Sequence, residues 1–332
     1  MDKIIGIGNA LVDVLVHVSD ERLAAMNLPK GSTQFIGRKQ FIESRSTIAA
    51  MNPARARGGS AANTISALAN LGNSSGLIAK TGRDEDGDFY EAECRKAGMD
   101  TLLKRSGTPT GVATTFITPD GQRTFLDYLG AAVELTADDI TDNMLAGYKY
   151  LYLEGYLVQN HALVDSVVST ARRMGMKICL DMASYNIVES DLEYFTTLVR
   201  NYVDIVFANE EESLAFTGLE PAKALETIAG MCDIAIVKLG AKGSTAARRD
   251  ASSGTLEKAA VAAGKVEHVT DTTAAGDFFA AGFLHALVHG RTLEECLEAG
   301  TVLSSEIIQV VGATLPEERW NEVRRRINEI CK

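Results

Sequence analysis

Apolar and polar residues follow two different patterns along the second half of this chain. Short apolar runs are typical of buried strands, whereas apolar residues at every third or fourth position are typical of helices that bury one face. Strands that alternate with helices predict a mostly parallel sheet covered by helices on both faces. The short runs predict strands at 148–154, 176–181, 203–208 and 234–239, with helical segments between them.

The first 130 residues are less regular. Residues 4–18 alternate as one strand would, and Pro119-Asp120-Gly121 is a turn signal between two strand-like arms within 111–130. These arms stand outside the strand–helix alternation. We therefore expect residues 1–332 to form a single domain, with a small β lid built from parts of 12–58 and 111–130.

A run of small residues precedes the helix predicted at 276–289, within Asp271-Thr272-Thr273-Ala274-Ala275-Gly276-Asp277. Small side chains leave the first N–H groups of a helix uncovered, and with the helix dipole these groups form an anion site. Asp277 would lie in the first turn, beside the bound anion. A carboxylate there can accept a proton from a hydroxyl that attacks a phosphate. The alternative is an ordinary helix start with an acidic first turn.

Other candidate residues follow predicted strands or lie close to glycines. Ligands in parallel sheets bind beyond the carboxyl ends of the strands. Oxygen ligands near Asn209 could hold magnesium, and Gly58-Gly59 would let the backbone approach a ligand before Ser60 caps a helix. Each position also has a structural interpretation, as a turn, a cap or an acidic helix start. The candidates are Asn9, Asp13, Gly59, Asn63, Asn209, Glu212, Lys238, Gly240 and Gly243.

Composition narrows the classes of function. The formal net charge of −11 argues against a nucleic-acid-binding or membrane-adhering surface. Five scattered cysteines and the absence of a basic leader predict free thiols and a cytoplasmic location. Gly6-Ile7-Gly8 lacks the third glycine of a dinucleotide fingerprint, which leaves an oxidoreductase a distant alternative. The five histidines show no metal-ligand spacing, so we expect structural roles for them.

The stretch from Asp271 to Asp277 resembles the C-terminal signature of the PfkB/ribokinase family of small-molecule kinases. The segment from Gly58 onward resembles that family's N-terminal signature, about two hundred residues earlier. Within the family, two segments are similar to the adenosine kinase-like branch: Gly8-Asn9-Ala10-Leu11-Val12-Asp13 and Gly312-Ala313-Thr314-Leu315-Pro316-Glu317. The commoner family pattern has Gly at the position of Ala274.

The resemblance implies a ribokinase-like three-layer α/β/α fold and ATP-dependent phosphorylation of a primary hydroxyl. The acceptor would be a nucleoside, most plainly adenosine, with a sugar kinase or a non-catalytic nucleoside-binding protein as alternatives. It also implies a monomer or a lid-mediated homodimer, Mg²⁺ as cofactor, and a monovalent cation near Asp271. In the family, the residues matching Ala274, Ala275, Gly276 and Asp277 form the anion hole, and the one matching Asp277 is the base. The acceptor would be bound by the residues that match Asn9, Asp13, Gly59 and Asn63. ATP would be bound by the residues that match Asn209, Lys238, Gly240 and Gly243. The residue that matches Glu212 would hold Mg²⁺ through water.

Overall fold

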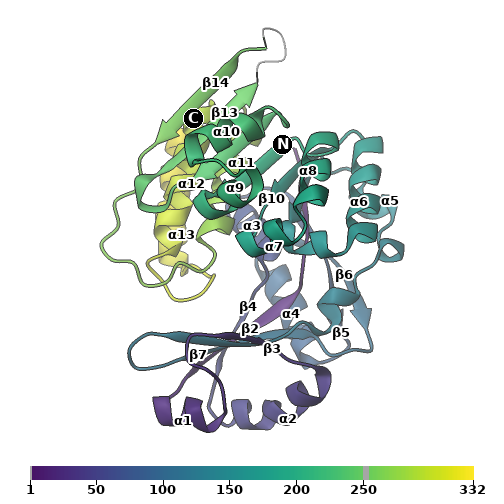
Figure 1. The fold of residues 1–332 in the computed structure, drawn as a ribbon, viewed down its shortest axis with the longest axis vertical. Helices are drawn as coiled ribbons and strands as arrows, with labels where there is room; N and C mark the ends of the chain where they lie inside the picture. The colour runs from purple at the N-terminus through teal and green to yellow at the C-terminus, as the bar shows by residue number, and fades with distance from the viewer. Residues whose placement is uncertain (1, 250–253) are drawn as a thin grey trace.

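The computed structural model describes residues 2–249 and 254–332, and its main body is a sheet of nine strands (Figure 1). All neighbouring strands in this sheet are parallel except for two antiparallel pairs at one edge, β12–β13 and β13–β14. The order across the sheet is β14 (Leu256–Val261), β13 (Ser244–Arg249), β12 (Ile234–Lys238), β11 (Ile205–Asn209), β10 (Lys177–Asp181), β9 (Tyr150–Glu154), β1 (Ile4–Ile7), β5 (Ser75–Gly82) and β6 (Asp100–Ser106).

Helices cover both faces of the nine-stranded sheet, because successive side chains of each buried strand point to opposite faces. One face packs on α3 (Ser60–Asn70), α4 (Glu85–Lys96), α11 (Ala275–Val288), α12 (Leu293–Ile307) and α13 (Glu317–Ile330). The other packs on α6 (His161–Arg173), α7 (Tyr185–Ser190), α8 (Leu192–Asn201), α9 (Glu210–Thr217) and α10 (Pro221–Ala229). The predicted three-layer α/β/α class is thus confirmed.

A second sheet of five strands lies below the main body in Figure 1. Its order is β3 (Thr33–Phe35), β8 (Arg123–Tyr128), β7 (Gly111–Ile117), β2 (Leu11–His17) and β4 (Ala54–Arg57). One face of this sheet carries Val14 and Val16, which belong to the same apolar cluster as Leu23 and Phe41. Those two residues come from α1 (Asp20–Ala25) and α2 (Arg38–Ala49). The helices α1 and α2 therefore cover one face of the small sheet, and the opposite face points to the main body.

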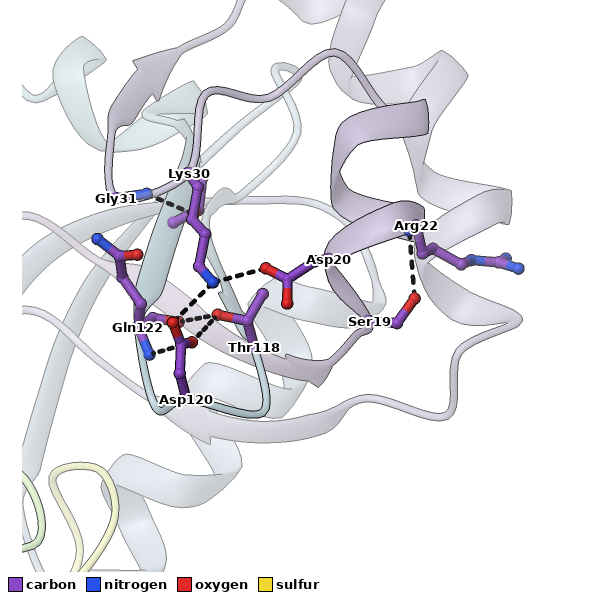
Figure 2. Close-up of polar contacts among 9 residues, drawn as sticks. Ser19, Asp20, Arg22, Lys30, Gly31, Thr118, Asp120 and Gln122 are labelled. Carbon is purple, nitrogen blue, oxygen red and sulfur yellow. Dashed lines mark hydrogen bonds and ion pairs between the residues drawn. The ribbon is translucent and has the colours of Figure 1, made fainter.

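The turn between β7 and β8 is held by one lysine (Figure 2). The Lys30 amine donates to Asp20 at 2.5 Å and to Asp120 at 2.7 Å, linking α1 to the turn. Thr118 also donates to Asp120, at 2.7 Å. The Lys30 hydrogen bond is the main reason that the pKa of Asp120 lies well below its usual value. These contacts fix the tip of the small sheet.

One predicted strand needs correction, and one observed strand was not predicted. The alternating run at 4–18 is two strands, because the chain leaves the main sheet after Ile7 and enters the small sheet at Leu11. The strand β6 lies outside the predicted elements because its exposed edge position tolerates the polar residues of Asp100–Ser106. Across the described residues, no helix is both long and apolar enough to cross a bilayer.

Candidate active site

The helix α11 begins at a backbone position that few side chains adopt. Its N-cap, Ala274, has a φ of 60°, in the left-handed region. Residues 272–275 form a turn that leads into the helix, because the Ala275 N–H donates to the carbonyl of Thr272 at 3.2 Å. A Cβ at Gly276 would lie 3.0 Å from the Lys238 amine, so glycine leaves the lysine room. The start of α11 thus has an open backbone and a cation beside it.

Asp277 is the central carboxylate of this site. Its oxygens accept hydrogen bonds from Ser60 Oγ at 2.7 Å and from Asn63 Nδ2 at 3.0 Å. Both donors come from the first turn of α3. Burial raises the pKa of Asp277 to about 6, although the two hydrogen bonds and Lys238 act in the opposite direction. The site holds a carboxyl whose pKa is close to neutral, as expected for a general base.

This geometry corrects the expected role of Ser60 and gives Asn63 a second task. Ser60 is not the N-cap of α3; Gly59 occupies that position with a φ of 93°, and the Ser60 hydroxyl donates to Asp277 instead. Asn63 is buried, and its Oδ1 accepts a hydrogen bond from Arg57 at 3.3 Å. Both polar side chains therefore orient the Asp277 carboxylate.

Four adjacent parallel strands of the main sheet carry a polar residue at their carboxyl ends. They are Glu154 on β9, Asp181 on β10, Asn209 on β11 and Lys238 on β12. The amine of Lys238 lies 3.2 Å from Asp181. Burial alone would lower the pKa of Lys238, but Asp181 and then Glu212 raise it above its ordinary value. The lysine is therefore a buried ammonium ion at the start of α11.

Asn209 and Glu212 form a capping box at the start of α9. The Glu212 N–H donates to Asn209 Oδ1, and the Asn209 backbone and side-chain amides donate to the Glu212 carboxylate, each at 2.8 Å. Asn209 and Glu212 therefore form the acidic helix start that the structural interpretation of this segment predicted. Glu212 is only 4% exposed, and burial raises its pKa even though Lys238 acts against this. The carboxylate still borders the cavity and retains lone pairs for a further ligand.

A cavity of about 780 Å³ lies beyond these strand ends, beside the start of α11. Gly240, with a φ of 54°, has nothing within 4 Å of a would-be Cβ, and its backbone is open to the cavity. A Cβ at Gly243 would lie 2.0 Å from the Val261 carbonyl, so that glycine serves the close contact with β14. Of the predicted residues, the wall contains Asn209, Glu212, Lys238, Gly240, Gly243, Ala274, Ala275, Gly276 and Asp277.

None of the predicted acceptor residues is among the described residues that line the large cavity. Asn9 donates from its backbone and its side-chain amide to Glu154, each at 2.8 Å. A Cβ at Gly59 would lie 2.2 Å from the Asn9 carbonyl, and one at Gly58 would meet the Asp13 carboxylate. The two glycines therefore let the start of α3 approach Asn9 and Asp13 closely.

Asp13 and Asp127 lie in one row across β2, β7 and β8 on the main-body face of the small sheet, and these two residues are called the acidic row below. Burial raises the pKa of Asp13 to about 7; Arg57 acts against this, and Asp127 and Asp277 act with it. The pKa of Asp127, on β8, is raised by burial to about 6. Among the described residues, Oδ1 of Asp127 is buried without a hydrogen-bond partner. A buried oxygen without a donor is expected where a ligand supplies one.

One ion pair connects the small sheet to the loop before α11. Arg123 of β8 donates to Asp271 at 2.7 Å and to Thr273 at 2.9 Å. Asp271 also accepts from the backbone N–H groups of Thr273 and Gly312. Burial would raise the pKa of Asp271, but Arg123 and these N–H groups lower it to about 2. The Asp271 carboxylate is therefore satisfied by protein donors, and the monovalent cation expected near this loop stays a prediction.

Sequence reasoning missed Glu154, Asp181, Asp127 and Arg123. The first two carry a signal that was available, since each is a charged residue at the carboxyl end of a buried apolar strand. Asp127 and Arg123 lie on the alternating arm of the hairpin, where such residues usually face water. Only the placement of the small sheet against the main body shows that this face is covered.

A model of the pfkB carbohydrate kinase family matches residues 30–320. The chain therefore belongs to the pfkB family. It is a phosphotransferase that acts on alcohol groups, which sets aside the oxidoreductase and non-catalytic alternatives.

Individual relatives and solved structures indicate which branch of the family this chain resembles. The fold is similar to that of adenosine kinase from Sinorhizobium meliloti, with a TM-score of 0.85 and 32% identity, covering 98% of this chain and 99% of that one. A probable sugar kinase from Rhizobium etli also gives a TM-score of 0.85, with 30% identity and 98% of each chain covered. Adenosine kinase 1 of Arabidopsis thaliana is 25% identical over 95% of this chain and 96% of its own. The chain resembles the adenosine kinase-like branch.

The raised pKa of Asp277 predicts the pH dependence of this kinase. A base must be unprotonated to accept a proton, so activity should be lost as the pH falls through about 6. We expect kcat/KM for the acceptor to fall about tenfold or more between pH 7 and pH 5. Initial rates across this range test it, with circular dichroism as a control for folding. A flat profile down to pH 5 would contradict an Asp277 base with this pKa.

Proposed function

We propose that this kinase transfers the γ-phosphoryl group of ATP to the primary hydroxyl of a nucleoside, with adenosine as the acceptor. The observation that carries the proposal is the position of Asp277. Its carboxylate is held by Ser60 and Asn63, lines the large cavity and is close enough to Asp13 to raise the pKa of that carboxyl. A base in this position can serve a hydroxyl on one side and a phosphate on the other.

Asp277 would accept the hydroxyl proton while the acceptor oxygen bonds to the γ-phosphorus and the bond to the ADP oxygen breaks. In a loose transition state the proton can leave late, so a carboxylate is basic enough. The N–H groups of Gly276 and Asp277 would stabilise charge on the transferring group. Lys238, whose amine lies beside Gly276, would add a buried positive charge there.

The large cavity would hold ATP, with Gly240 and Gly243 near its phosphates. Asp181, Glu212 and Asp277 surround the single amine of Lys238 in this wall. Carboxylate oxygens in such a cluster fit Mg²⁺, which usually keeps several of its waters. Glu212 would hold the ion through water, and the bound metal would offset the charge of the nucleotide phosphates.

Asp13 and Asn9 would bind the vicinal hydroxyls of the acceptor ribose, because a carboxylate accepts two hydrogen bonds and an amide both donates and accepts. Asn9 is fixed by Glu154, which positions it for this contact. The unpartnered Oδ1 of Asp127 supports a further hydroxyl or amino donor from the ligand. Asn9 and the acidic row therefore suit a polar acceptor with several hydroxyl groups.

A nucleoside base also needs an apolar wall, and the small sheet offers one. Leu15, Thr115 and Phe125 lie side by side on β2, β7 and β8, two residues along from the Asp13 row. Since side chains two apart share a face, these three point to the same side as Asp13. Tyr156, which lines the large cavity, offers a second aromatic ring.

The second candidate is a sugar kinase of the same family. The R. etli structure named a probable sugar kinase matches this fold as closely as the S. meliloti adenosine kinase does. The hydroxyl contacts proposed for Asn9 and Asp13 would also suit a furanose sugar. The apolar row at Leu15 and Phe125 favours the nucleoside.

The arrangement around the small sheet favours a monomer over a lid-mediated homodimer. Its outer face is already covered by α1 and α2, through Leu23 and Phe41. The ring of Phe41 stacks on Tyr128 with centroids 4.2 Å apart. A dimer that joined two small sheets through this face would have to displace both helices.

We expect Asp277→Asn to lower kcat by roughly 100- to 10,000-fold, the usual effect of losing a general base. ATP binding should remain nearly unchanged, because the amide keeps the shape of the side chain. Steady-state kinetics and nucleotide titration would measure both effects. A variant that keeps more than about a tenth of wild-type turnover would show that Asp277 is not the base.

Glu212→Gln should raise the Mg²⁺ concentration needed for half-maximal rate by about 10- to 100-fold, as is usual when an outer-sphere ligand is lost. Glutamine can still close a capping box, so α9 should keep its start. Glu211→Gln is the matched control, since Glu211 is exposed in the same turn. Equal Mg²⁺ requirements in the two variants would assign Glu212 to capping alone.

Adenosine should give the highest kcat/KM in an ATP-consumption screen that also contains other nucleosides, ribose, fructose and 2-keto-3-deoxygluconate. Phe125→Ala should raise KM for adenosine by roughly 5- to 150-fold, the range expected for losing one stacked base. The KM for any sugar used should change little. If a free sugar is preferred and adenosine is not used, the nucleoside assignment fails while the Asp277 chemistry stands.

A further inference from the structure

Two histidines and a cysteine meet at the end of α11 that is far from Asp277. His285 lies in the last turn of α11, His289 is its C-cap, and Cys331 is the C-cap of α13. The spacing of four residues places both imidazoles on one side of the helix. One potential ligand atom from each of the three residues lies within 4.8 Å of the others. The chain order hides this cluster, because Cys331 follows two helices later.

Hydrogen bonds set both imidazole rings in the form that binds metal through Nε2. His285 Nδ1 lies 2.5 Å from Asn73 Oδ1, and His289 Nδ1 lies 2.7 Å from the His285 carbonyl oxygen. Since an amide or carbonyl oxygen can only accept, Nδ1 of each ring carries the proton and Nε2 has a lone pair. Metal-binding histidines usually make this second hydrogen bond, which orients the ring.

The surroundings of the cluster also suit a metal ligand set. His285 is buried, and His289 and Cys331 are half-buried, so little water competes for the three ligand atoms. Arg291 donates to the Cys331 carbonyl at 2.7 Å, which holds the end of α13 in place. A bound cation would displace the thiol proton, as thiol ligands require.

We propose that His285, His289 and Cys331 form a binding site for Zn²⁺ or a similar soft divalent ion. Two imidazoles and one thiolate are ligands that select zinc over magnesium or calcium. Tetrahedral bond lengths near 2.0–2.3 Å place ligand atoms about 3.5 Å apart, so small side-chain rotations would close the site. With three protein ligands, water would take the fourth position.

The site would act on stability and not on phosphoryl transfer. Along α11, His285 lies roughly 12 Å and His289 roughly 18 Å from Asp277, at a rise of about 1.5 Å per residue. A metal bound there would fasten the end of α13 to α11. Binding to the folded state alone raises thermal stability, so Tm should rise with zinc while kcat stays the same.

The test uses the full-length chain, free of any affinity tag, stripped with a chelator and then titrated with Zn²⁺ in competition with a chromophoric chelator. We expect one equivalent to bind with a submicromolar Kd. Co²⁺ in its place should give the intense near-ultraviolet absorption of a thiolate ligand. Cys331→Ser should abolish that absorption, and both Cys331→Ser and His289→Gln should weaken zinc binding at least 10- to 100-fold.

Matched controls separate this site from general metal binding. Cys232→Ser changes a buried cysteine elsewhere, and His161→Gln changes a half-exposed histidine on α6; both should bind zinc like the wild type. Zinc binding of equal affinity in Cys331→Ser and the wild type would overturn the proposal, as would no stoichiometric binding at micromolar zinc. The outcome is independent of the acceptor, because it is read from metal binding and Tm.

Discussion

The structure depends most on how one carboxylate is held at the start of α11. A buried charge is tolerated only where donors surround it, and Asp277 finds its two donors on α3, more than two hundred residues earlier in the chain. This contact fixes the two helix starts relative to each other. The glycines before α3 serve a different contact, since they let the start of α3 lie against Asn9 and Asp13.

The same contact creates an electrostatic problem that the rest of the site answers. Asp181, Glu212 and Asp277 lie around one ammonium group, and burial raises the pKa of Glu212 and of Asp277. The site is therefore short of positive charge before a nucleotide brings more negative charge. The open N–H groups at the start of α11 supply part of the compensation. A divalent cation carried with the nucleotide would supply the remainder, which is consistent with a kinase that uses a metal–nucleotide complex.

Much of this organisation could be predicted from the sequence. The alternation of strands and helices gave the main sheet because buried parallel strands are apolar along their whole length. The small residues before Asp277 indicated the start of α11 for a similarly local reason, while the anion site there stays a prediction. The donors to Asp277 were harder to predict, because Ser60 satisfies the sequence rules for a helix cap. Only the packing of α3 on α11 directs its hydroxyl to Asp277 instead. Arg123 was not predictable, because its partner Asp271 lies on a different part of the chain.

The two halves of the site are under different constraints. The half that holds Asp277, Lys238 and Glu212 is formed by strand ends and helix starts, whose positions are fixed by the core. The half proposed to bind the acceptor is formed by alternate residues of the small sheet, such as Leu15 and Phe125, which are only half-buried. Substitutions at half-buried positions usually cost less stability than substitutions in the core. This division is consistent with one fold being shared by chains named adenosine kinase and chains named sugar kinase.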